Sequence, residues 1–277
     1  MMPRKKAFTL IELLVVTAII AVLTTILVPS LGRAKDLTRR AICGVQIRGL
    51  AQANAAYAEE NGGFHVLASQ DIFFGNGGRM RWHGQRVSPG YSSDPADNWF
   101  DPAKSPLVDY LGQDGKIKKC PSFADYVKST GAFESGTGGY GYNQQYIGGR
   151  NDLFGFGPEA SAMSACKTDI ARPAETVMFT DAAFIQESPD RIIEYSFCEP
   201  PYWQFSEGAP SAQRPNPSIH FRHLDLCNVA WADAHVESRP LSFSARYKTH
   251  GQLDAETVKA AGFGWFGPDS NELFDLK

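Results

Sequence analysis

The hydrophobic pattern at the start of the chain is a single long apolar run. Residues 8–28 are mostly apolar, and Glu12 is the only charged residue among them. In a helix, about 20 apolar residues rising about 1.5 Å each span the hydrocarbon core of a bilayer. An acidic side chain at mid-membrane costs about 2.5–3.5 kcal/mol on insertion scales. We therefore expect a membrane-spanning segment in which Glu12 has a partner for its charge.

The pattern becomes amphipathic after Pro29. Small and apolar residues recur at three- and four-residue spacing, which indicates a helix with one apolar stripe. The stripe contains Leu31, Ala34, Leu37, Ala41, Ile42, Val45, Gly49, Ala53, Ala56 and Tyr57. An Asn-Gly-Gly sequence at residues 61–63 is a helix stop signal. We predict one stem helix over residues 8–60, about 75–80 Å long. Its transmembrane half is residues 8–28, its exported half is residues 29–62, and Pro29 kinks it between them.

The short leader before the apolar run sets its orientation. Arg4, Lys5 and Lys6 are basic, and the leader has no acidic residue. By the positive-inside rule, this end stays in the cytoplasm and everything after the run is exported. The run is too long for an ordinary cleavable secretory signal, and no A-x-A cleavage site follows it. These features predict a single-pass membrane anchor.

The leader and the first turns of the helix also form a known motif. Residues 6–16 read Lys-Ala-Phe-Thr-Leu-Ile-Glu-Leu-Leu-Val-Val. This motif resembles the class III prepilin leader of type IV pilins and type II secretion pseudopilins. The resemblance implies that a prepilin peptidase removes residues 1–7 by cutting between Ala7 and Phe8, and that the new amine of Phe8 is N-methylated. The family usually has glycine before the cut, where this chain has the small residue Ala7.

The same resemblance implies a structural function rather than an enzymatic one. In a packed filament, Glu12 of one subunit would pair with the Phe8 amine of a neighbour, which neutralises both charges in the membrane and sets the axial stagger. The implied partners are the prepilin peptidase, copies of this chain or other pilins, an inner-membrane assembly platform and the lipid bilayer. The exported domain would be periplasmic, or extracellular in a filament. The resemblance leaves pilus and secretion pseudopilus open.

The remainder of the chain, residues 63–277, reads as a globular extracytoplasmic domain rich in β-structure. Strand-like runs occupy residues 176–180, 191–197 and 228–232, and a further run at residues 235–237 follows a turn at Asp233-Ala234. Short helical segments are expected at residues 107–111 and 254–261. The predicted fold class is α+β and pilin-like, with a long N-terminal helix packed on an antiparallel sheet.

Several motifs in this domain resemble one subgroup of large pilin-like proteins, abundant in planctomycete- and verrucomicrobia-type bacteria. The matching segments are residues 43–51, Cys-Pro-Ser at residues 120–122, Tyr-Gly-Tyr-Asn at residues 140–143, and Arg222-His223 with residues 228–236. Two positions depart from the subgroup pattern. Gln46 stands where the subgroup has asparagine, and Ala234 stands where it has the glycine of a tight turn.

Composition narrows the remaining functions. The chain has 277 residues and a net charge of −3, so nothing indicates nucleic-acid binding. It has five cysteines, none in C-x-x-C spacing, which argues against a zinc knuckle or a thioredoxin-like site. Disulfides are permitted outside the cytoplasm. A candidate disulfide between Cys43 and Cys120 would tie the helix to the domain, whereas pairing among Cys166, Cys198 and Cys227 stays open.

The remaining chemical candidates are polar clusters. Five potential ligands fall within sixteen positions: His220, His223, Asp225, Asp233 and His235. Of these, His223, Asp233 and His235 could bind zinc or manganese, and a membrane-anchored metal-binding or enzymatic domain is the alternative function. We favour a hydrogen-bonded turn, since no nucleophile or phosphate loop accompanies the group.

Three aspartates in or near loops are candidate calcium ligands. Asp152, Asp169 and Asp181 could serve as calcium ligands, but they lack the spacing of a calcium loop and are expected to be solvated acids. We therefore expect no cofactor.

Overall fold

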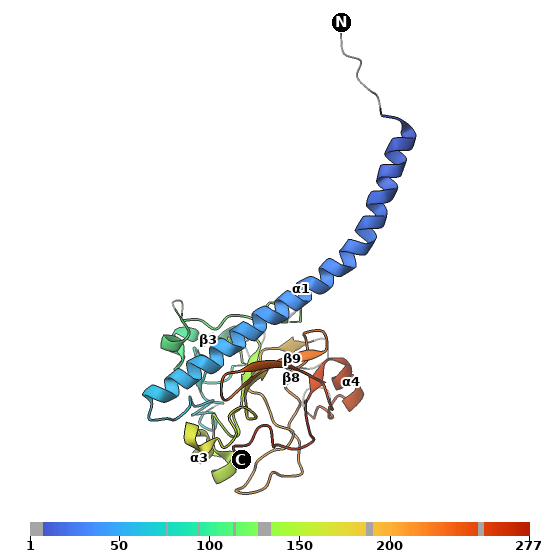
Figure 1. Cartoon of the computed structure of the whole chain (residues 1–277). Helices are drawn as coiled ribbons and strands as arrows, with labels where there is room; N and C mark the ends of the chain where they lie inside the picture. Colours follow the sequence, from blue (N-terminus) through green and yellow to red (C-terminus); the bar gives the residue numbers. More distant parts are fainter. Residues whose placement is uncertain are drawn as a thin grey trace. The chain divides into compact units, whose positions relative to one another are not determined.

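The structure of the chain is a computed structural model (Figure 1). Its first element is a long N-terminal helix. The structure describes residues 8–75, 77–92, 95–112, 115–126, 134–186, 191–248 and 252–277. Helix α1 runs without interruption over Leu10–Glu60 and includes Pro29. The chain forms two compact units, Met1–Thr38 and Arg39–Lys277, so that α1 contributes to both. The predicted leader, including Ala7, lies outside the described residues.

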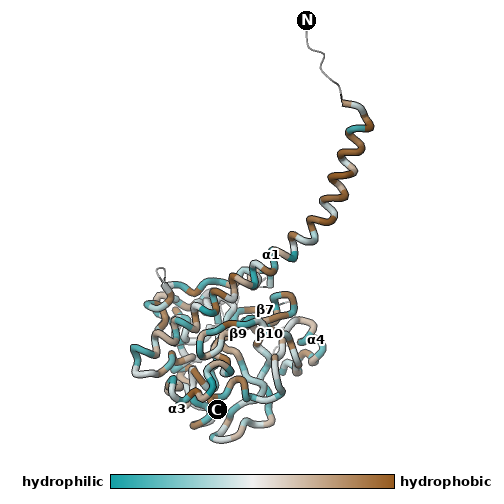
Figure 2. The backbone as a smooth tube through the Cα atoms, in the orientation of Figure 1, coloured by the Kyte–Doolittle hydropathy of each residue, from teal (hydrophilic) through white to brown (hydrophobic). Residues whose placement is uncertain are grey.

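Within the first unit, α1 is apolar on all sides over residues 10–28, apart from Glu12. Its large side chains are exposed, from Leu10 at 80% to Val16 at 45%, and the tube is brown over this part of the helix in Figure 2. Thr17, Thr24 and Thr25 donate their hydroxyls to backbone carbonyls of the same helix. A helix that satisfies its own polar groups suits a lipid environment. By length and mean hydropathy, this helix qualifies as a membrane span.

The part of α1 in the second unit has one buried face. The buried residues are Cys43, Ile47, Leu50, Ala51, Ala53, Asn54 and Ala58. The predicted stripe placed Ile42 and Val45 on this face, but they are 43% and 72% exposed. That assignment was wrong because the packing face includes a thiol and a carboxamide, Cys43 and Asn54, which bond to other segments of the domain.

The helix ends where the sequence predicted. Gly62 and Gly63 follow Glu60 with φ values of +66° and +90°, a conformation that glycine adopts without strain. The amide of Gly63 donates to the carbonyl of Ala58, which closes the last turn. Pro29 has no amide hydrogen to donate to the carbonyl of Thr25, yet the helix continues through it. Whether Pro29 kinks the stem stays a prediction.

The largest sheet has four antiparallel strands. Strands β4 (Tyr140–Tyr142), β5 (Val177–Asp181), β9 (Leu226–Trp231) and β10 (Val236–Pro240) lie in the order β10-β9-β5-β4. The predicted hairpin is confirmed, since β9 and β10 pair directly. Ala234 in its turn has φ +67°, a left-handed conformation that costs a non-glycine residue about 1–2 kcal/mol.

The other strands are short and form three small antiparallel sheets. They are β1 (Met80–Arg81), β2 (Gly84–Arg86), β3 (Phe100–Asp101), β6 (Phe184–Ile185), β7 (Ile192–Ile193), β8 (Ile219–His220) and β11 (Phe263–Gly264). The strand expected over residues 191–197 is confirmed only as β7, which pairs with β6. Two-residue strands depend on long-range pairing and leave little periodic signal.

Short helices connect these strands. The α-helices are α2 (Asn151–Phe154), α3 (Pro158–Ser161) and α4 (Ala255–Ala260), and the 3₁₀ turns are Pro95–Asn98, Pro102–Lys104, Val108–Tyr110, Phe123–Asp125 and Lys167–Asp169. Both predicted helical segments are confirmed, as Val108–Tyr110 and as α4, which Asp254 caps by accepting from the amide of Thr257. The architecture is therefore α+β and pilin-like, with a long N-terminal helix followed by a domain of antiparallel sheets.

An aromatic core joins α1 to the main sheet within the second unit. The rings of Tyr142 and Phe179 stack with centroids 4.7 Å apart, and Trp82 meets Phe179 edge-on at 5.1 Å. Asn54 on α1 donates its carboxamide to the hydroxyl of Tyr142 at 3.0 Å and accepts from the amide of Val66 at 2.9 Å. The helix is thus fixed to the domain by specific hydrogen bonds as well as by apolar contact.

Candidate functional site

Glu12 and Thr9 form a reciprocal cap at the start of α1. Glu12 Oε2 accepts hydrogen bonds from the amide of Thr9 at 2.8 Å and from its hydroxyl at 2.7 Å. The amide of Glu12 in turn donates to Thr9 Oγ1 at 3.3 Å. A carboxylate in the first turn also interacts favourably with the positive end of the helix dipole. Among the described residues, Glu12 Oε1 accepts no hydrogen bond.

Phe8 lies four residues before Glu12, so the implied cleavage site is next to this cap. The Phe8 side chain is 75% exposed, and it is followed at once by Thr9. A chain that began at Phe8 would carry its amino group about one helical turn from the Glu12 carboxylate. The structure thus places Phe8 and Glu12 at the same end of the apolar helix.

A second polar site is buried in the domain, where Cys43 on α1 meets Cys120. Their Sγ atoms lie 2.7 Å apart, and both residues are fully buried as free thiols. Arg222 Nε lies 3.4 Å from Cys120 Sγ, and His223 Nε2 lies 3.7 Å from it. The cluster therefore brings together two thiols and two potential cations from three distant parts of the chain.

Asp181, the last residue of β5, holds the two cations in place. Its Oδ1 accepts from Arg222 Nη2 at 2.7 Å, and its Oδ2 lies 3.2 Å from His223 Nε2. The amide of Asn228 on β9 donates to Oδ2 at 2.7 Å. The side chains of Asp181, Arg222 and His223 are all 0% exposed. Each oxygen of this carboxylate is thus already engaged.

Burial and charge act against each other on the ionisation of this cluster. Burial alone would lower the pKa of His223, but the Asp181 carboxylate outweighs it and raises that pKa to about 9. Burial would raise the pKa of Asp181, and Arg222 and His223 reverse the effect, so that its pKa is lowered. The hydrogen bond from Cys43, together with Arg222, lowers the pKa of the Cys120 thiol. Cys120 is accordingly the more acidic of the two thiols.

The predicted metal ligands His223, Asp233 and His235 do not come together. His223 lies in the buried cluster, whereas Asp233 and His235 are 38% and 43% exposed in their side chains. His235 Nδ1 lies 2.6 Å from Asp233 Oδ1, and its ring stacks on Trp231 at 5.7 Å between centroids. This pair belongs to the hairpin turn. Metal binding at these residues stays an untested prediction.

The predicted calcium ligands are engaged by arginine. Arg150 Nε contacts Asp152 at 2.9 Å, and Arg150 Nη1 contacts Asp169 at 2.7 Å, so these acids are paired rather than merely solvated. Asp181 is held by Arg222 in the buried cluster. Whether any of the three binds calcium also stays untested.

The other three cysteines are free thiols in the structure. Cys198 and Cys227 are buried, and Cys166 is partly exposed. No sulfur–sulfur contact joins these three described residues to one another. The pairings considered for them from the sequence stay predictions.

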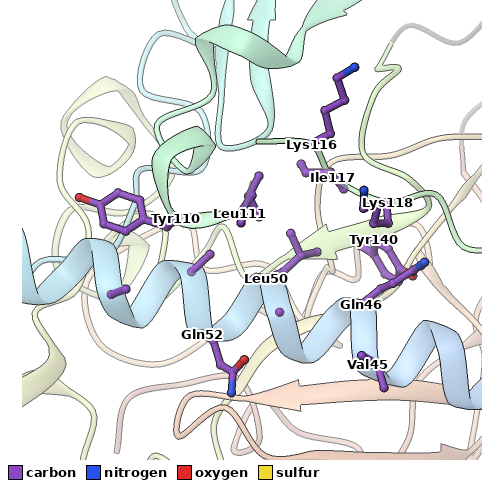
Figure 3. A pocket seen from close by; sticks show the side chains of 14 residues that line it. Val45, Gln46, Leu50, Gln52, Tyr110, Leu111, Lys116, Ile117, Lys118 and Tyr140 are labelled. Atoms are coloured by element: carbon purple, nitrogen blue, oxygen red, sulfur yellow. The ribbon is translucent and has the colours of Figure 1, made fainter. Parts of the chain in front are cut away.

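A groove of about 530 Å³ runs beside α1 within the second unit (Figure 3). The helix contributes small and polar residues to it, among them Gly49 and Gln52, and the 3₁₀ turn at Val108–Tyr110 contributes Tyr110. Tyr140 donates its hydroxyl to Gln46 Oε1 at 2.7 Å. Gln46, which departs from the subgroup pattern, is therefore a direct link between α1 and β4.

The sequence paired Cys43 with Cys120, and the structure brings the two together, but the contact of His223 with Cys120 was missed. Arg222 was noted only as part of a motif, and Asp181 only as a loop acid that could bind calcium. The available signals were the adjacent basic pair Arg222-His223 and a carboxylate at the end of a fully buried strand. A buried charge of this kind needs a partner, although the sequence does not say which.

Comparison with known proteins identifies the N-terminal segment. Residues 2–28 match the family described as the prokaryotic N-terminal methylation motif. No curated protein and no solved structure matches the chain. The motif, together with the long apolar helix, is consistent with a prepilin leader of the type IV pilin kind and supports a protein of the pilin or pseudopilin type. A single apolar N-terminal helix of this length also fits a single-pass membrane anchor in such a protein.

Proposed function

We propose that this protein is a structural subunit of a type IV pilus or of a type II secretion pseudopilus. It would be processed by a prepilin peptidase between Ala7 and Phe8, N-methylated at Phe8, and assembled through α1 by a membrane-embedded platform. The observation that carries this proposal is the exposed apolar segment of α1, residues 10–28, whose single carboxylate, Glu12, lies within the first turn.

The arrangement at Glu12 supports an intermolecular partner. Both hydrogen bonds that reach its carboxylate end on Oε2 and come from Thr9, so Oε1 has room for a donor from another chain. An unpaired carboxylate at mid-membrane would cost about 2.5–3.5 kcal/mol on insertion scales. A neighbouring Phe8 amine would neutralise that charge and would be neutralised in turn. Pairing across subunits thus favours one axial register.

The exposed apolar surface gives the second line of support. Side chains around the whole circumference are uncovered, among them Leu14 at 62%, Ile19 at 55% and Ile26 at 67%. Such a surface is stable in lipid before assembly and against the helices of other subunits afterwards. The proposed partners are therefore copies of this chain or other pilins, and the lipid bilayer surrounds the helix before assembly.

The experiment is to express the full chain with Glu12→Ala in cells that contain the assembly machinery. We expect normal membrane insertion and normal leader removal but no filaments, measured by fractionation, N-terminal mass and sedimentation of sheared polymers. Thr17→Ala is the matched control, because Thr17 lies in the same helix and its hydroxyl donates to the carbonyl of Leu14 within that helix. A Glu12→Ala chain that polymerised like the control would contradict the pairing.

Processing is tested separately by the mass of the chain extracted from membranes. We expect an N-terminus at Phe8 that carries one methyl group. A basic residue in place of the small one, Ala7→Lys, should block cleavage, and Ala7→Gly should preserve it. A chain that retains Met1 with no trimmed form would contradict the proposal, whatever the Glu12 experiment shows.

A further inference from the structure

We propose that Cys43 and Cys120 are a reversible dithiol–disulfide pair in which His223 holds a proton in the reduced state and releases it when the disulfide forms. The disulfide would cross-link α1 to the segment that precedes the Phe123–Asp125 turn. Its reaction partner would be the disulfide of an exported thiol–disulfide exchange protein. This inference depends on the buried cluster alone and is independent of filament assembly.

The sulfur positions favour a disulfide over a metal site. Tetrahedral zinc with Zn–S bonds of about 2.3 Å would hold two sulfurs about 3.8 Å apart. The Sγ atoms of Cys43 and Cys120 are only 2.7 Å apart, so they need to approach by about 0.7 Å to reach a disulfide bond length. His223 Nε2 completes the only group of three metal-type ligands found among the described residues.

The charges around the sulfurs also oppose a metal ion. Arg222 lies against both Cys120 and Asp181, which puts a permanent cation beside a sulfur that would have to bind zinc. Both oxygens of Asp181 already accept hydrogen bonds from this cluster and from Asn228. A dication would have to displace this network, whereas a neutral disulfide leaves it intact.

Charge neutrality then links the thiols to His223. In the reduced cluster, a Cys120 thiolate and the Asp181 carboxylate balance Arg222 and protonated His223. Forming the disulfide removes the thiolate, which would leave two cations against one buried carboxylate. Because an unbalanced buried charge is costly, His223 should lose its proton at the same time. With Cys120 as a thiolate in the reduced state, both redox states are neutral only if His223 changes its protonation.

In the part of the chain that the structure describes, no other ionisable group near the cluster can take over this role. The groups that face it from the elements packed around it are Cys43 on α1, Tyr140 on β4, Asp181 on β5, His220 on β8, Cys227 on β9 and Arg222. Burial lowers the pKa of His220 and raises the pKa values of Tyr140 and Cys227, so these three stay neutral near pH 7. His223 is the group poised to change.

The exchange balances as an ordinary two-step thiol–disulfide reaction. Cys120 is fully buried, so the exchange takes place when local opening of the domain exposes its sulfur. The Cys120 thiolate then attacks one sulfur of the partner disulfide, forming a mixed disulfide and releasing the partner's other sulfur as a thiolate. Cys43 loses its proton and attacks Cys120 Sγ, which forms the Cys43–Cys120 bond and releases the second partner thiolate. The partner disulfide takes up two electrons and two protons and becomes a dithiol, with one proton from Cys43 and one from His223.

The first test is non-reducing peptide mapping of the full chain in detergent micelles, after oxidation and after reduction. We expect one linked peptide pair containing Cys43 and Cys120 in the oxidised protein. The linkage should be lost in Cys120→Ser and retained in the matched control Cys227→Ser, which changes another buried thiol. Oxidised protein without this linkage, or reduced protein that retains one equivalent of zinc through purification, would overturn the proposal.

The second test follows the proton on His223 by NMR of the histidine-labelled wild-type chain in both redox states. We expect His223 to titrate at a higher pH in the reduced form than in the oxidised form. A second readout is the equilibrium constant for reduction by dithiothreitol between pH 7 and 8.5, corrected for the reagent. In the wild-type chain, reduction by two electrons should take up two protons, so the equilibrium constant should change a hundredfold per pH unit. In His223→Gln, reduction should take up only one proton, so the equilibrium constant should change tenfold per pH unit. Identical titration of His223 in both states would overturn the proton step.

Discussion

The two parts of α1 use the same secondary structure for opposite purposes. Over residues 10–28 the side chains are exposed and mostly apolar (Figure 2), whereas over Arg39–Glu60 one face is buried against the domain. Hydroxyl groups in the first part bond to carbonyls of their own helix, as Thr24 does with Ile20. Polar groups in the second part reach other segments, as Asn54 does with Tyr142. The first part is therefore built to meet other molecules, and the second is built to hold its own domain.

The largest expected contrast is between two isoleucines, Ile47 and Ile19. Ile47 is fully buried, so Ile47→Ala should lower the free energy of unfolding of the domain by about 2–5 kcal/mol. Ile19 is 55% exposed, and Ile19→Ala should leave it unchanged. Denaturant unfolding in micelles, followed by tryptophan fluorescence, measures this difference, because all five tryptophans lie in the second unit. Equal effects of the two substitutions would erase the distinction between the parts.

Acid should lower the free energy of unfolding of the domain, because buried histidines become protonated when it unfolds. Burial lowers the pKa of His65 to about 4, with a smaller contribution from Lys167, and His65 follows α1 by five residues. In the unfolded chain its pKa is about 6.5. Between these values the unfolded state binds the proton and the folded state does not. Stability is therefore complete above about pH 6.5 and falls as the pH drops toward 4, by roughly 3 kcal/mol for this group.

The measurement for His65 is urea unfolding at pH 7 and pH 4.5. Both ring nitrogens of His65 lack a hydrogen-bond partner in the described structure, so His65→Leu should preserve the packing and reduce the loss of stability in acid. His235→Gln is the matched control, since His235 is exposed at the hairpin turn. His83 and His220 are also buried with lowered pKa values, so some acid sensitivity should remain. An unchanged loss in His65→Leu would show that other groups account for it.

A polar pair gives a contrast of intermediate size. Asn54→Ala removes the acceptor of the Val66 amide and the donor to the Tyr142 hydroxyl, both of which are buried. The Tyr142 hydroxyl still donates to the Val66 carbonyl, but the buried Val66 amide loses its acceptor, which should cost about 1–3 kcal/mol. Thr24→Ala removes only a bond within the helix and should leave the unfolding of the domain unchanged. If both variants unfold at the same denaturant concentration, the buried hydrogen bonds of Asn54 do not stabilise the domain.

The same contrast explains what the sequence could and could not predict. The apolar run, Glu12 and the helix end at residues 61–63 are local patterns, so they identified the helix within two residues of its observed start. The face that α1 buries depends on distant partners, and the stripe through Ile42 and Val45 was therefore assigned wrongly. Helical periodicity reports that one side is apolar, but it does not report which residues the domain contacts.

The buried cluster shows the same limit more strongly. Cys43 and His223 are separated by 180 positions, yet both contact Cys120. Spacing rules find ligand sets only when the residues share one local element, as in a hairpin or a helical turn. The sequence accordingly grouped His223 with Asp233 and His235, its neighbours in the chain. The fold instead paired His223, which lies between β8 and β9, with Asp181 at the end of β5.

The smallest expected effect comes from glycines in the two parts of α1. A methyl group added at Gly44 would meet Val236 Cγ1 at 3.8 Å, an ordinary contact, and Gly44→Ala should therefore stabilise the domain by up to about 1 kcal/mol through helix propensity. Gly32→Ala has nothing within 4 Å and should not change unfolding of the domain. Gly141→Ala should have the opposite effect on stability from Gly44→Ala. Its methyl group would lie 2.5 Å from the backbone of Phe197 and should destabilise β4. A loss of stability in Gly44→Ala, measured by the same fluorescence assay, would mean that β10 packs on α1 more tightly than its Val236 contact indicates.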